Sequence, residues 1–195
     1  MSAGLWEGDT TYSVGPGGDF EFGDNLEYSH APLDIKFSLT VAHHLQVDFP
    51  PGADHLALEP EGGWMPWLAR GSRPETIRRD QPFRFTSSGP VKMRVECQYL
   101  ITSNCAIANR AGQRVPVETR ITLPSGMYLL TGGPVSKQRL HTIDELTAIS
   151  DQYVANQPAE MHFEVGASDV ETMLRYPDTT FKGNVTVVWD SFLMP

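Results

Sequence analysis

The stretch Lys182-Gly183-Asn184-Val185-Thr186-Val187-Val188-Trp189-Asp190-Ser191-Phe192 decides the fold. Val185, Val187 and Trp189 lie at alternate positions, which places their side chains on one face of a half-buried pleated strand. A strand this apolar has to pair inside a sheet, because an unpaired apolar edge recruits other chains. The rest of the sequence must therefore supply the strands that lie beside it.

Composition limits the class of protein. The 195 residues carry a net charge of −9, include 17 Gly and 15 Pro, and are long enough for one sizeable core. A sequence pI near 5.0 argues against a nucleic-acid or anionic-membrane surface, which requires basic clusters. No apolar run is long enough to span a membrane, and the first residues lack the features of a signal peptide. These features suit either a cytoplasmic protein or a mature secreted one.

Most of the chain has the pattern of strands separated by turns. The most regular alternation runs from Ile35 to Phe49 and predicts one long strand, or two strands joined by a bend at His43-His44. The remaining expected strands are Phe83–Phe85, Val91–Ile101, Cys105–Ala108, Val115–Leu123, Met127–Leu130 and Met161–Val165.

Two segments have helical character. Leu140 to Ala155 has apolar residues at helical spacing, with Thr142 as a capping residue, and Ser168–Glu171 resembles the start of a second short helix. Many strands with one or two short helices predict a mainly β fold, an immunoglobulin-like β-sandwich.

The first thirty residues look like strands with a break between them. Tyr12 and Val14 alternate with small polar residues, and Phe20 and Phe22 alternate again after a glycine-rich turn. We therefore expect residues 1–30 to form an arm that pairs within its own domain or with a neighbouring molecule, and residues 31–195 to form the sandwich.

Cys97 and Cys105 are the only cysteines and are separated by eight positions. Thr102-Ser103-Asn104 between them has turn chemistry that can bring the two sulfurs together. A bridge would add about 2.5 kcal/mol of stability on the loop-entropy model. The less favoured alternative is two separate buried thiols in a reducing cytosol.

Trp64 and Trp67 lie in a segment rich in glycine and proline. They form either an exposed contact surface for a ligand or a cover for one end of the core. The second interpretation is favoured, because large aromatic side chains are usually buried.

No catalytic or metal-binding motif is evident. The six histidines are scattered, and His43 and His44 are adjacent on a strand and so point to opposite faces. Gly15-Pro16-Gly17-Gly18 precedes a strand, not a helix, and therefore does not form a phosphate-binding loop. We expect a non-enzymatic binding or assembly protein without metal or cofactor.

Both ends of the chain resemble one family. Phe181–Ser191 resembles the C-terminal strand of bacterial chaperone/usher fimbrial (pilus) subunits. Trp6-Glu7-Gly8-Asp9, followed by Ser13-Val14 and a glycine-rich turn, is similar to the mature N-terminus of adhesive fimbrial subunits of enterotoxigenic enteric bacteria.

This resemblance implies an incomplete sandwich that is completed by a donated strand. A periplasmic chaperone supplies that strand first, and the N-terminal extension of the next subunit replaces it in the fibre that the outer-membrane usher secretes. The implied location is the extracellular fimbrium on the bacterial surface. The implied partners are neighbouring subunits, the chaperone, the usher and a host glycan or receptor, but no nucleic acid.

The resemblance also assigns roles to residues, and it favours an oxidised Cys97–Cys105 pair. The implied donor side chains are Tyr12, Val14, Phe20 and Phe22. The implied edge of the acceptor groove comprises Phe37, Leu39, Val41, Val185, Val187 and Trp189. The alternatives are a free-standing carbohydrate-binding or virion module that uses Trp64 and Trp67 and, less favoured, a hydrolase on a sandwich scaffold.

Overall fold

The computed structural model describes residues 4–23, 25, 27, 32–71 and 73–191. The chain divides into two compact units, Met1–Ala42 and His43–Pro195, and each is described separately. Among the described residues, no helix has the length and apolar character needed to cross a membrane.

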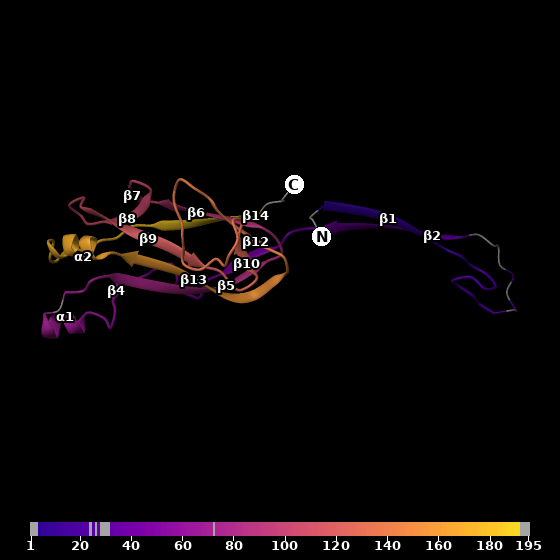
Figure 1. Cartoon of the computed structure of the whole chain (residues 1–195), viewed down its shortest axis with the longest axis horizontal. Helices are drawn as coiled ribbons and strands as arrows, with labels where there is room; N and C mark the ends of the chain where they lie inside the picture. Colours follow the sequence, from indigo (N-terminus) through magenta and orange to yellow (C-terminus); the bar gives the residue numbers. More distant parts are fainter. Residues whose placement is uncertain (1–3, 24, 26, 28–31, 72, 192–195) are drawn as a thin grey trace. The chain divides into compact units, whose positions relative to one another are not determined.

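The first unit is an antiparallel pair of strands, β1 (Gly4–Tyr12) and β2 (Leu33–Val41), which we call the ribbon (Figure 1). Residues directly opposite each other share a face of such a pair. One face carries the apolar residues Trp6, Tyr12, Leu33, Ile35, Phe37, Leu39 and Val41. The other face carries mainly polar residues, namely Glu7, Asp9, Thr11, Asp34, Lys36, Ser38 and Thr40 beside Leu5.

The domain boundary expected at residue 30 is wrong, because β2 pairs with β1 and belongs to the first unit. The long alternation is divided into two strands, and β3 (Leu45–Asp48) begins after the bend at His43-His44. Alternation shows that one face of a strand is apolar but not which strand pairs with it, so the sequence left this division open.

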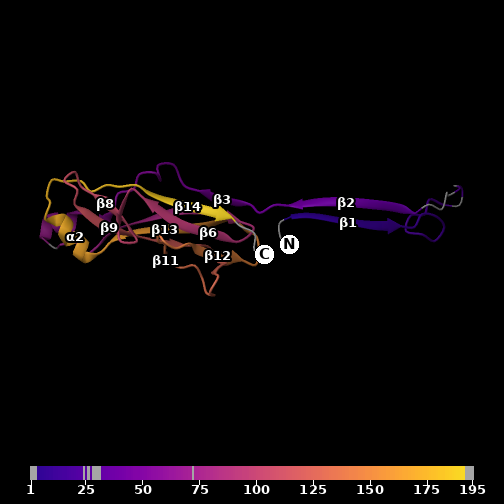
Figure 2. The ribbon, with the colours of Figure 1, turned by 90° about the horizontal axis from the view of Figure 1, so that it is seen from above.

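The second unit is a β-sandwich of two antiparallel sheets, which confirms the predicted mainly β class (Figures 1 and 2). The smaller sheet has the order β10 (Met127–Leu129), β12 (Leu146–Ser150), β6 (Val91–Cys97), β14 (Val185–Ser191). The larger sheet has the order β3, β5 (Ile77–Ser87), β13 (Val154–Val165), β9 (Arg114–Thr122), β8 (Asn104–Ala108), β7 (Tyr99–Ile101). Short strands β4 (Glu59–Pro60) and β11 (Gln138–Arg139) flank β5 and β9.

The main core lies between the two sheets. Phe85 and Ile121 of the larger sheet are fully buried in the same cluster as Met93 and Ala148 of the smaller sheet. A second cluster joins Val115, Val117 and Val165 to Val170 of helix α2 (Ala167–Leu174). Helix α2 confirms the shorter of the two expected helices.

The helix expected from Leu140 to Ala155 is wrong. Leu140 is buried, but Ile143 and Tyr153, which share its helical face in the sequence pattern, are exposed. This segment instead forms β12, which pairs with β10 and β6, followed by the start of β13. Tertiary pairing overrides a weak helical period here, because Leu146–Ser150 alternates equally well as a short strand.

Candidate functional site

Strand β14 forms an open edge of the smaller sheet. It pairs with β6, where Val187 lies opposite Val95, and no other described strand pairs with it. Val185, Val187 and Trp189 are half-buried and pack against the main core, while Thr186 between them is exposed. The strand therefore covers the core with one face and leaves its outer backbone edge without a described sheet partner.

A groove of about 710 Å³ opens beside β14. β14 and residues 49–58 contribute to its walls, and residues of β8, β9 and β13 line it from the larger sheet. Its apolar lining consists of Phe49, Pro50, Ala53, Leu56, Leu58, Ile107, Val117, Met161, Phe163, Val185, Val187 and Trp189. The groove therefore exposes an apolar inner surface of the sandwich along a sheet edge that no described strand covers.

The apolar face of the ribbon is a second candidate interaction surface. Phe37 is 55% exposed and Leu39 49% exposed, and Leu33 and Ile35 on the same face are also exposed. A row of exposed large apolar side chains on one face marks an interaction surface. A two-stranded hairpin is also only marginally stable in water without a covered apolar face.

The expected donor residues do not form one continuous strand. Tyr12 ends β1, and Val14 forms an isolated bridge with Phe20 across the glycine-rich turn. The rings of Tyr12 and Phe20 meet edge to face with their centroids 5.3 Å apart. Phe22 lies outside any strand and is exposed. Tyr12, Val14 and Phe20 therefore form a local cluster around a turn.

The expected acceptor edge is divided between the two units. Val185, Val187 and Trp189 line the groove beside β14. Phe37 and Leu39, like Val41, lie on β2 of the ribbon and are not among the lining residues, so their assignment to the groove edge is wrong. Sequence alternation could not reveal this, because donor and acceptor strands have the same period.

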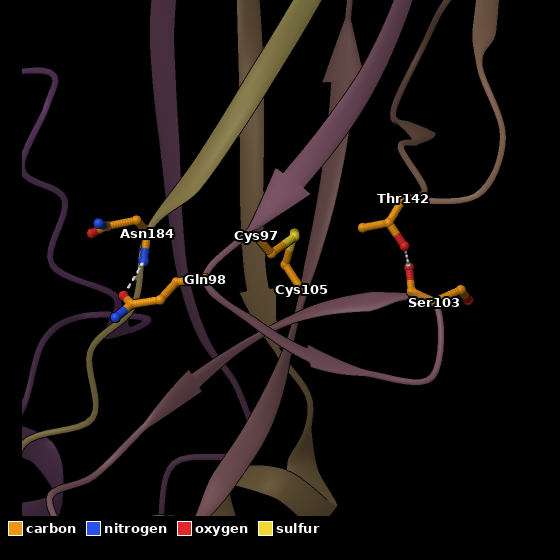
Figure 3. Close-up of a disulfide and its surroundings, with 6 residues drawn as sticks. All are labelled: Cys97, Gln98, Ser103, Cys105, Thr142 and Asn184. Atoms are coloured by element: carbon orange, nitrogen blue, oxygen red, sulfur yellow. Dashed lines mark hydrogen bonds between the residues drawn. A yellow bond between two sulfur atoms is a disulfide. The ribbon is translucent and has the colours of Figure 1, made fainter.

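The predicted disulfide is present. Cys97 at the end of β6 bonds to Cys105 of β8, with a Cα–Cα distance of 5.3 Å, and so joins the two sheets (Figure 3). Beside it, the Gln98 backbone N–H donates to the Asn184 carbonyl over 2.9 Å, and the Asn184 N–H donates to Gln98 Oε1 over 3.2 Å. The disulfide thus lies where β14 begins.

The turn between β7 and β8 is anchored on the other side of the disulfide. The Thr142 hydroxyl donates to the Ser103 carbonyl over 3.1 Å, as Figure 3 shows. This bond connects the turn to the loop that precedes β12. The disulfide region is therefore held from both sheets.

Trp64 and Trp67 do not cover the core. Trp67 lies in helix α1 (Met65–Arg70), Trp64 precedes it, and their ring centroids are 6.0 Å apart. Neither belongs to a core cluster, and Met65 and Leu68 beside them are strongly exposed. The favoured interpretation of these tryptophans as a core cover is wrong, and the contact-surface interpretation is retained.

A polar chain that the sequence did not indicate crosses β5, β13 and β9. His162 is 8% exposed, and its Nδ1 lies 2.8 Å from Asp80 Oδ1 and its Nε2 2.8 Å from Thr122 Oγ1. Ligand atoms of Asp80, Glu160 and His162 lie within 4.8 Å of one another. Both ring nitrogens already have hydrogen-bond partners, so the arrangement is best explained as a structural link between three strands. The participants are far apart in sequence, and no local motif marks them.

Replacing His162 by Ala is expected to lower the free energy of unfolding by about 1–3 kcal/mol, because it leaves Thr122 without this partner and opens a small cavity. Urea unfolding measures this change. Glu160→Ala is the control on the same strand, and its expected effect is within about 0.5 kcal/mol because the side chain is partly exposed. Equal effects of the two substitutions would contradict the structural role of His162.

Comparison of the chain with protein-family models, curated proteins and solved structures gave no match. Function is therefore inferred from the sequence pattern and from the geometry of the open edge and the ribbon.

Proposed function

We propose that the chain is a non-enzymatic fimbrial subunit that joins its neighbours by strand addition at the open edge of β14. The observation that carries this proposal is the groove of about 710 Å³, which lies beside the edge of β14 that no described strand pairs with and is lined in part by residues of the two core clusters.

Strand addition suits both parts of this site. A strand placed along β14 forms main-chain hydrogen bonds with its free edge, and its alternate side chains enter the groove. The apolar lining favours apolar side chains, because their transfer from water is the main source of binding free energy. The incoming strand would complete the smaller sheet.

The proposed location is the bacterial surface, reached through the periplasm with a chaperone and an outer-membrane usher. The Cys97–Cys105 disulfide supports an oxidising compartment of this kind. The net charge of −9 supports partners other than nucleic acid.

The proposed contribution to adhesion is made by helix α1. Trp64 is 37% exposed beside the more exposed Met65 and Leu68, and aromatic side chains often line sugar- and protein-binding surfaces. The same feature favours the second candidate function, a free-standing carbohydrate-binding or virion module. Loss of glycan binding in Trp64→Ala without any self-assembly of the parent chain would favour that alternative.

The test of the proposed function compares two lysine substitutions on β14. Val187→Lys places a charge in the groove, whereas Asp190→Lys places it at an exposed position of β14 that does not line the groove. The parent chain and Asp190→Lys are expected to form oligomers in light scattering and electron microscopy, and Val187→Lys is expected to remain a monomer. A parent chain that stays monomeric over the whole concentration range contradicts the proposal.

A further inference from the structure

We propose that the ribbon of one copy fills the groove of the next copy, with its strand β2 alongside β14. This inference rests on the proposed function and adds the identity of the donor. It replaces the expected donor residues around the glycine-rich turn with the apolar face of β2.

The pattern and length of β2 fit the groove. β2 has nine residues, with apolar side chains at Leu33, Ile35, Phe37, Leu39 and Val41, and β14 has seven residues. Strands pair residue by residue, so β2 is long enough to cover the whole of β14. A row of alternate apolar side chains is what a groove with an apolar lining accepts.

The backbone edges also match. β2 pairs with β1 along one edge, and no described strand pairs with the other. The same holds for β14, whose described partner is β6. Pairing the free edge of β2 with the free edge of β14 would satisfy both rows of backbone groups and continue the smaller sheet through the ribbon.

The two faces of the ribbon determine which side enters the groove. Glu7, Asp9 and Lys36 lie on the polar face, and burying these charges without partners is costly. The apolar face enters the groove, and the polar face therefore stays in solvent. Each subunit would then contribute two strands to its neighbour, because β1 remains paired with β2.

β2 is a better donor than β1. On the apolar face, β1 presents Gly8 and Thr10 where β2 presents Phe37 and Ile35. A side chain at Gly8 would clash with the Phe37 ring, which lies across this position. The glycine therefore leaves space for the largest side chain of the donor face, and β2 supplies most of the apolar surface.

The contact joins two different surfaces of the same chain. Such a heterologous contact does not close on itself in general, and its repetition produces an open filament. The ribbon and the groove, as two different surfaces of one chain, thus account for fibre growth with one type of subunit.

The experiment uses full-length chains and two matched aspartate substitutions in the ribbon. Phe37→Asp places a charge on the apolar face, and Thr40→Asp places one on the polar face opposite Leu5. Sedimentation is expected to show that Phe37→Asp weakens self-association by roughly a hundredfold or more, because an apolar contact is replaced by a buried charge. Thr40→Asp is expected to assemble like the parent chain.

Mixing the variants provides the decisive readout. Phe37→Asp retains a groove and Val187→Lys retains a ribbon, so the mixture is expected to form 1:1 heterodimers that cannot grow further. A synthetic peptide of residues 33–41 provides a second measurement that does not depend on the groove variant. It is expected to bind Phe37→Asp chains and to block assembly of the parent chain, while the peptide carrying Phe37→Asp does neither.

The outcomes distinguish failure of the inference that β2 is the donor from failure of the proposed function. If Val187→Lys prevents assembly but Phe37→Asp does not, the groove accepts another strand, and the inference about β2 is wrong while the proposed function remains. If Phe37→Asp prevents assembly but Val187→Lys does not, the ribbon pairs elsewhere, and the inference is also overturned. A parent chain that never assembles overturns both.

Discussion

Replacing Trp189 by Ala is expected to lower the free energy of unfolding of the sandwich by about 3 kcal/mol. The indole packs against two aromatic rings of β5, with centroid distances of 5.8 Å to Phe83 and 5.9 Å to Phe85. Phe85 is fully buried, so removing the indole leaves a cavity against the centre of the core. The value lies at the lower end for tryptophan because Trp189 is only half-buried.

Urea or thermal unfolding of the full chain measures this effect. Asp190→Ala is the matched control, because it changes the next residue of β14 but removes an exposed side chain. Its expected effect is within about 0.5 kcal/mol. A loss below about 1 kcal/mol for Trp189→Ala would show that the ring contributes little to the core, and β14 would then no longer be a defined wall of the groove.

The sequence correctly predicted that β14 is a half-buried strand with one apolar face. Val185, Val187 and Trp189 alternate over a short run, and the structure places them against the core. The pattern carried this information because a half-buried strand has a strict period of two. It could not identify β6 as the neighbouring strand, because pairing between distant segments leaves no local signal.

The ribbon shows the limit of the same reasoning. The most regular alternation in the chain, from Ile35 to Phe49, predicted one or two strands of the sandwich, but its first part lies in β2 of the ribbon. The structure leaves that apolar face exposed on a two-stranded sheet. Alternation indicates that one face of a strand is apolar and favours burial. It does not indicate whether the same molecule or another molecule buries that face.

The helix predicted from Leu140 to Ala155 is wrong for a different reason. Its helical period rested on few apolar positions, and two of them, Ile143 and Tyr153, are exposed in the structure. Ala148 is fully buried between β10 and β6 instead. A short strand that fills a gap in a sheet is decided by its neighbours, which the local sequence does not describe.

Removing the Cys97–Cys105 disulfide is expected to lower the free energy of unfolding by about 2.5 kcal/mol. The bond closes a short loop and joins β6 of the smaller sheet to β8 of the larger one. Its loss raises the conformational entropy of the unfolded chain and removes the one disulfide cross-link between the sheets, since the chain has two cysteines. The double substitution Cys97→Ala/Cys105→Ala avoids placing a hydroxyl at the buried Cys105 position.

The effect of this bond should extend to the proposed acceptor edge. Cys97 lies opposite Val185, and the hydrogen bonds between Gln98 and Asn184 hold the start of β14 beside it. Amide hydrogen exchange at Val185 and its neighbours is therefore expected to accelerate in the double variant more than exchange in β13. Reductant should destabilise the parent chain by the same amount and leave the double variant unchanged, because only the parent has a bond to reduce. Equal stability of the oxidised parent and the double variant would mean that the disulfide neither restrains the loop nor supports β14, and strand addition would then depend on the hydrogen bonds of the edge alone.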